Sequence, residues 1–123
     1  MSATEPAPLA QAYFRFLQLA RAVEALPTSS LMDANEAALL EAVVLKWHEG
    51  APMTVREAIQ LAELGSPATL HKRVTRLRQK ELLTTYSEPS DRRAKFLVPT
   101  PRAMAYFSHL GRSMQQVQTL QVN

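Results

Sequence analysis

The sequence predicts a mainly α-helical domain with one short β-hairpin in its C-terminal half. Apolar residues recur at helical spacing over most of the chain, and Pro, Gly and capping residues separate the helical stretches. Between residues 82 and 98 this spacing gives way to short runs bearing Thr, Tyr, Phe and Val, which are typical of strands. With 123 residues, 46% of them hydrophobic and 20% charged, the chain is expected to form a single domain over 1–123.

Two helices are predicted before residue 50. The first covers 8–26, with an apolar stripe formed by Leu9, Tyr13, Phe16, Leu17, Ala20 and Val23. The second begins after Asp33 or Asn35, either of which can cap it, and it ends near Glu49, just before Gly50. Its inward residues are expected to be Leu40, Val43, Val44 and Trp47.

Two further helices are predicted around a glycine turn at Gly65. Thr54 opens the third, and Glu57 three residues later completes a capping box. Its expected buried stripe is Val55, Ala58, Ile59 and Ala62. Ser66 caps the fourth helix, which carries Pro at its first position and runs to about Lys80. Its buried edge is expected to be Leu70, Val74 and Leu77.

A hairpin and a last helix complete the predicted order. Residues 82–87 and 94–98 form the strands, and the polar segment 88–92 forms the turn. Thr100 followed by Pro101 starts a helix over 101–121. Its apolar residues follow the alternating spacing of a coiled-coil seam: Ala103, Phe107, Leu110, Met114 and Val117.

Positive charge is concentrated in one quarter of the chain. Residues 66–95 hold eight basic and three acidic residues, whereas the rest of the chain holds six basic and eight acidic residues. Such a concentration is expected of a phosphate-binding face. The alternative is a solvated helix whose charges only maintain solubility.

A glycine turn between two helices, a basic second helix and a hairpin with arginines at its tip are typical of a winged helix-turn-helix. In this reading the core covers 35–99, the recognition helix 66–80 and the wing 88–95. The sequence here resembles MarR-type transcriptional regulators in a Ser-x-x-Thr helix start, an Arg-Leu pair and an Asp-x-Arg wing. These elements fall on Ser66 and Thr69, Arg76 and Leu77, and Asp91 and Arg93.

The resemblance implies a homodimeric repressor that binds duplex DNA and is open to a small-molecule effector of unknown identity. The first and last helices would dimerise through Tyr13, Leu17, Phe107, Leu110, Met114 and Val117. Glu81 stands where these regulators usually have glycine. Because a left-handed conformation costs a non-glycine residue about 1 kcal/mol, we expect the recognition helix to end differently here.

Helical geometry selects the residues that would face DNA. The residues opposite the buried edge are Ala68, Lys72, Thr75, Arg76 and Gln79. The base edges are expected to meet Ala68, Thr69, Lys72 and Arg76. Arg73, Lys80 and Lys95 are expected at phosphates. In the wing, Asp91 would hold Arg93 extended, so that Arg92 or Arg93 reaches the minor groove; the alternative is an ordinary surface ion pair. The predicted DNA-binding residues are Ser66, Ala68, Thr69, Lys72, Arg73, Thr75, Arg76, Arg92, Arg93 and Lys95.

Several other classes of protein are disfavoured. The chain has no cysteine, no apolar run long enough to cross a bilayer and no secretory pattern at residues 1–10, so we expect a cytoplasmic, bacterial-type protein that is nucleoid-associated when bound to DNA. No catalytic motif or metal-ligand spacing occurs, so neither an enzyme nor a metal or cofactor site is expected. The alternative function is a winged-helix module whose basic face binds an acidic protein partner.

Overall fold

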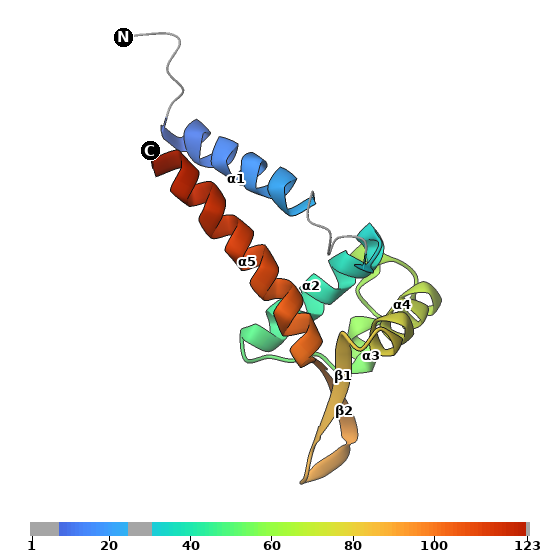
Figure 1. The fold of residues 1–123 in the computed structure, drawn as a ribbon. Coiled ribbons are helices and arrows are strands. Elements are labelled where there is room, and N and C mark those ends of the chain that lie inside the picture. The colour runs from blue at the N-terminus through green and yellow to red at the C-terminus, as the bar shows by residue number, and fades with distance from the viewer. Residues whose placement is uncertain (1–7, 25–30, 123) are drawn as a thin grey trace. The chain divides into compact units, whose positions relative to one another are not determined.

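The computed structural model of the chain describes residues 8–24 and 31–122, and it confirms the predicted mainly helical fold with a small β-wing (Figure 1). The elements follow in the order α1 (Pro8–Glu24), α2 (Ala34–His48), α3 (Val55–Ala58), η2 (Ala62–Leu64, a single 3-10 turn), α4 (Pro67–Gln79), β1 (Leu83–Glu88), β2 (Asp91–Pro99) and α5 (Pro101–Val122). They form two compact units. The winged-helix unit comprises Met32–Ala105, and the helical unit comprises α1 with α5 from Tyr106 onward.

The core of the winged-helix unit is built from leucines of α2, α4 and the hairpin. The predicted buried edge of α4 is confirmed, since Leu70, Val74 and Leu77 are at most 2% exposed. The largest fully buried side chains are Leu39, Leu40, Leu70, Leu77, Leu82, Leu83, Leu97 and Val43. Because three apolar side chains fix one edge of α4, the opposite edge is held toward solvent.

Capping boxes open both α2 and α3. Asp33, rather than Asn35, caps α2, because its Oδ1 accepts from the Glu36 N–H at 2.7 Å while Glu36 Oε1 accepts from the Asp33 N–H at 3.1 Å. The predicted box at α3 is confirmed, with Thr54 and Glu57 exchanging the same pair of hydrogen bonds. Helix α3 ends at Ala58, however, and Ala62 lies exposed in η2 rather than in the predicted buried stripe.

The hairpin is longer than predicted. Strands β1 and β2 pair antiparallel from Leu83 opposite Pro99 to Glu88 opposite Asp91, so the expected turn over 88–92 shrinks to Pro89 and Ser90. A third segment joins the sheet at its base, where the Leu97 N–H donates to the Met53 carbonyl at 2.8 Å. Thr54 forms an isolated bridge with Phe96. The start of α3 is therefore bonded directly to the wing.

The expectation that α4 ends in an unusual way is wrong. Glu81 adopts the left-handed conformation itself, with φ of 59°. The Leu82 N–H donates to the Leu77 carbonyl at 2.9 Å and the Glu81 N–H to the Arg78 carbonyl at 3.0 Å, which is the Schellman arrangement. The Thr100 hydroxyl also donates to the Glu81 carbonyl. These bonds and the burial of Leu82 offset the strain of a non-glycine residue.

Helix α5 begins as predicted, with the Thr100 hydroxyl accepting from the Ala103 N–H at 3.1 Å. Its buried residues are Ala103, Tyr106 and Ser113, so the buried stripe differs from the predicted seam after the first turn. Polar Ser113 occupies a buried position next to Met114, which is 41% exposed. Within the described part of the chain, no helix is long and apolar enough to cross a membrane.

Candidate nucleic-acid interface

The N-terminal end of the recognition helix α4 is stabilised by the residues at and just before its first turn. Ser66 is its N-cap: its hydroxyl accepts from the Thr69 N–H at 3.3 Å and donates to the Thr69 hydroxyl at 2.9 Å. Pro67 follows at the first helical position, where its missing N–H is not needed. The Ser-x-x-Thr pattern therefore begins the helix, and it leaves Thr69 half-buried at the N-terminal end of the exposed face.

The predicted base-reading face of α4 is exposed. Ala68, Lys72, Thr75 and Arg76 all face solvent, opposite the buried leucine edge. The Thr75 hydroxyl donates to the His71 carbonyl one turn earlier, at 3.0 Å. Lys72 and Arg76, one turn apart, place two cations on a face without a neighbouring acidic residue in α4. This arrangement suits the major groove, although the role of each side chain stays a prediction.

Arg73 has a structural role that its sequence position did not indicate. Its Nη1 donates to the Leu64 carbonyl at 2.8 Å, and the residue is half-buried. A Cβ at Gly65, where φ is 150°, would lie 3.3 Å from the same Nη1. Arg73 thus fastens the turn that joins η2 to α4, and a phosphate contact would have to use its other N–H groups.

Lys80, which the sequence predicts at a phosphate, forms an ion pair with the carboxylate of Glu36. Its Nζ lies 3.0 Å from Glu36 Oε1 and 2.9 Å from Glu36 Oε2, and the Glu36 side chain is only 4% exposed. The physical reason is that a buried carboxylate needs a cationic partner close by. This ion pair joins the end of α4 to the start of α2, so it holds the recognition helix against the core.

The wing presents its basic residues to solvent. Arg92, Arg93 and Lys95 are all exposed. Asp91 contacts Arg93 through the main chain, because its Oδ1 accepts from the Arg93 N–H at 3.1 Å. The expected hold of Asp91 on an extended Arg93 therefore acts on the backbone of the wing tip rather than on the guanidinium.

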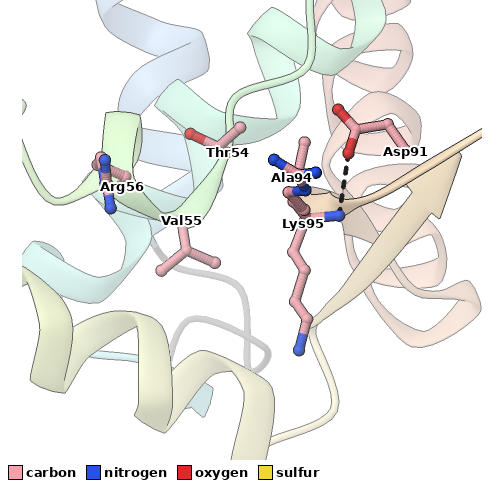
Figure 2. A pocket seen from close by; sticks show the side chains of 7 residues that line it. Thr54, Val55, Arg56, Asp91, Ala94 and Lys95 are labelled. Atoms are coloured by element: carbon pink, nitrogen blue, oxygen red, sulfur yellow. Dashed lines mark hydrogen bonds between the residues drawn. The ribbon is translucent and has the colours of Figure 1, made fainter.

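A groove of about 620 Å³ separates the start of α3 from the wing. Figure 2 shows Thr54, Val55 and Arg56 on one side and Asp91, Ala94 and Lys95 facing them from β2. Arg93 completes the lining. Arg56 was not predicted as a site residue: an arginine in the first turn of a short helix has no local signal, and only the pairing of residues 53–54 with β2 brings it beside the wing.

The predicted dimerisation residues differ in exposure. Tyr13 is 59% exposed and Leu17 39%, while Phe107 and Leu110 are half-buried. The side chain of Val117 lies outside the described residues.

Among the residues that the structure describes, no group of three His, Asp or Glu side chains could hold a metal ion.

Comparisons with known proteins agree with this architecture. Residues 32–103 match the family model described as winged helix DNA-binding domain. The chain is similar to the transcriptional regulator Tm0710 from Thermotoga maritima, with 19% identity, coverage of 91% of this chain and 80% of that one, and a TM-score of 0.65. A MepR variant of S. aureus bound to an oligodeoxyribonucleotide has 14% identity, coverage of 96% and 83%, and a TM-score of 0.65.

A third similar structure is Staphylococcus aureus MarR in complex with salicylate and kanamycin, with 20% identity, coverage of 93% and 76%, and a TM-score of 0.56. At these identities the structural similarity establishes the fold of the chain. This is the fold that the sequence resemblance to MarR-type regulators implied. The search of curated proteins gave no match.

Proposed function

Because the chain belongs to the winged helix DNA-binding domain family, we propose that it is a transcriptional regulator that reads a specific duplex sequence with α4 and contacts the backbone or minor groove with its wing. The observation that carries this proposal is the exposed face of α4. Lys72 and Arg76 face solvent there, while the apolar edge of the same helix is fully buried. A helix held in this way can enter a major groove without unfolding any other part of the unit.

The proposal assigns different roles to α4 and the wing. Arg76 would pair with a guanine, whose O6 and N7 acceptors match the guanidinium fork. Arg92, at the wing tip, would meet phosphates or the wall of the minor groove. Thr69 and Ala68 would contribute to base contacts at the N-terminal end of α4, and Lys95 would add a phosphate contact.

Selecting preferred duplexes from a random pool tests the function and yields the binding site. On the preferred duplex, Arg76→Ala should cost about 1–3 kcal/mol per half-site, with a smaller loss on random duplex. Arg92→Ala should weaken both duplexes about equally and reduce the salt dependence by roughly one counterion per contact. Equal losses on the two duplexes for Arg76→Ala would make that residue a phosphate contact.

The alternative function, a module that binds an acidic protein through its basic face, makes an opposite prediction. It requires that neither Arg76→Ala nor Arg92→Ala change the affinity for any duplex at any salt concentration. Measuring both variants on both duplexes across a salt series therefore separates the two functions.

We further propose that the protein acts as a homodimer in the cytoplasm and represses by occluding a promoter. The apolar side chains exposed on α1 support the dimer, together with a last helix of 22 residues. Two copies joined through α1 and α5 could set their recognition helices on successive major grooves, about 34 Å apart. A reporter gene placed behind the selected sequence tests the sense of regulation: repression predicts higher expression when the protein is removed.

A further inference from the structure

We infer that the groove between α3 and β2 holds the sugar–phosphate backbone of one DNA strand, with Arg56 as a phosphate contact. The inference rests on the proposed function and adds a contact surface to it beyond the face of α4 and the wing tip. It assigns a role to Arg56, which lies outside the basic segment 66–95.

The charges around the groove favour an anionic polymer. Three basic side chains line it, Arg56 from α3 and Arg93 and Lys95 from β2, together with one carboxylate, that of Asp91. This carboxylate is turned onto its own strand, since it accepts from the Arg93 N–H. The neighbouring carboxylate of Glu57 is bonded to the Thr54 N–H at 2.9 Å in the capping box.

The two walls of the groove are held at a fixed spacing. The hydrogen bond from the Leu97 N–H to the Met53 carbonyl and the bridge between Thr54 and Phe96 join the start of α3 to β2. Arg56 follows this junction by two residues, and Lys95 precedes it by one. Cations on two fixed walls can contact a backbone of regular phosphate spacing without reorganisation, which lowers the entropic cost of binding.

The exposure of these side chains favours DNA over a small anion. Arg56, Arg93 and Lys95 are all exposed, whereas sites for small molecules bury most of their ligand among convergent groups. The groove also borders the wing, so a strand lying in it would continue past Arg92 at the tip. Val55 and Ala94 add no charge of their own to the lining.

The test compares Arg56→Ala with Arg102→Ala. Both arginines are exposed second residues of their helices, α3 and α5, and Arg102 does not line the groove. Arg56→Ala should weaken preferred and random duplex equally, roughly three- to tenfold, and lower the salt slope by about one counterion per half-site. Arg102→Ala should change affinity less than about twofold.

Ethylation interference locates the contact on the DNA. Modification of one or two phosphates per half-site should block the unmodified protein but not Arg56→Ala, while Arg102→Ala keeps the full interference pattern. A groove that takes only free anions would give a different result: inorganic phosphate without DNA would bind the unmodified protein more tightly than Arg56→Ala, while the two proteins would show the same ethylation interference on DNA. That result would overturn the assignment to DNA.

The outcomes separate this inference from the proposed function. If Arg56→Ala resembles Arg102→Ala while Arg76→Ala still loses affinity selectively on the preferred duplex, the groove assignment is wrong and the function stands. If none of these substitutions affects any duplex, the function and the groove assignment fall together.

Discussion

Helices α4 and α1 carry similar amphipathic patterns, but most of the large apolar side chains of α1 are exposed whereas those of α4 are buried. Along α4, Leu70 and Leu77 are fully buried and Val74 is 2% exposed. Along α1, Leu9 is 86% exposed and Tyr13 59%, and the Tyr13 ring stacks on its helical neighbour Phe16, at 6.0 Å between centroids. A pattern of spacing therefore predicts which residues form an apolar face and leaves open whether the same chain covers it.

The difference follows from the partners available to each helix. Helix α4 contacts α2 and β1, which supply leucines to the same core. On α1 the exposed apolar side chains are Leu9, Tyr13, Phe14, Phe16 and Leu17. Several large apolar side chains exposed on one helix favour an interaction site over ordinary exposure. This is the basis on which we propose that α1 acts in a dimer, whereas α4 acts through its polar face.

The sharpest way to test the comparison is to truncate one leucine in each helix. Leu77→Ala removes a fully buried side chain and should lower the free energy of unfolding by roughly 2–5 kcal/mol. Leu9→Ala, at the 86% exposed position, should change it by less than about 0.5 kcal/mol. Urea denaturation followed by circular dichroism measures both. Equal losses would show that α1 is buried as deeply as α4.

A charge on the apolar face of α1 tests whether a second copy covers it. Leu17→Glu should convert a dimer into single chains of 13.7 kDa, because a carboxylate in an apolar interface cannot be solvated. Gln18→Glu, on the exposed neighbouring position, should leave the dimer intact. Light scattering at micromolar concentration measures the mass. A single-chain mass for the unmodified protein would refute the dimer.

The attachment of α4 to the core is tested at the Glu36–Lys80 ion pair. Glu36→Gln keeps an acceptor for the Asp33 N–H but removes the charge facing Lys80, and it should cost roughly 1–3 kcal/mol of stability. Glu41→Gln, on an exposed position of α2, is the matched control and should be nearly neutral. Equal denaturation midpoints for the two variants would show that the ion pair between α4 and α2 contributes nothing to the free energy of unfolding.

The C-terminal end of α4 offers a stabilising substitution. Glu81→Gly should raise stability by about 0.5–1 kcal/mol, because glycine adopts a φ of 59° without steric cost. Glu49→Gly at the end of α2 should lower it instead, since Glu49 has a φ of −76° and gains nothing from glycine. Thermal unfolding of both variants measures the difference. Destabilisation by Glu81→Gly would mean that the glutamate side chain itself stabilises the turn.

A smaller effect concerns acid stability of the winged-helix unit. The N–H of Thr54 holds the pKa of Glu57 below its usual value of 4.5. A lowered pKa means that this carboxylate stabilises the fold fully above pH 4.5 and loses the contribution as the pH falls through the folded value. Glu57→Gln should therefore flatten the loss of stability below pH 4.5, measured by denaturant titration. The same slope in both proteins would contradict this.

Much of the fold could be predicted because its signals are local. The buried edge of α4, the Thr54–Glu57 capping box and the hairpin follow from spacing and from residues that lie within one turn of each other. The solvent-exposed side of α4 followed in turn, as the side opposite Leu70, Val74 and Leu77.

The features that escaped prediction depend on residues brought together by folding. Glu36 and Lys80 are 44 residues apart, and the contact of Arg73 with the Leu64 carbonyl spans a turn whose path the sequence leaves open. Glu81 shows the reverse case, in which a local preference against the left-handed conformation is outweighed by hydrogen bonds from Leu82 and Thr100. Arg56 joined the candidate interface only through the pairing of Met53 with Leu97.

The attachment of residues 53–54 to the base of the wing divides the hairpin into two parts with separate tasks. The Leu97 N–H bonds to the Met53 carbonyl and Phe96 forms a bridge with Thr54, while residues 88–93 beyond them are exposed and contribute no core side chain. Substitutions and short insertions in this tip are therefore expected to leave the core of the winged-helix unit unchanged. The tip is thus a segment whose sequence can change, in evolution or by engineering, at little expense to the stability of the domain that carries it.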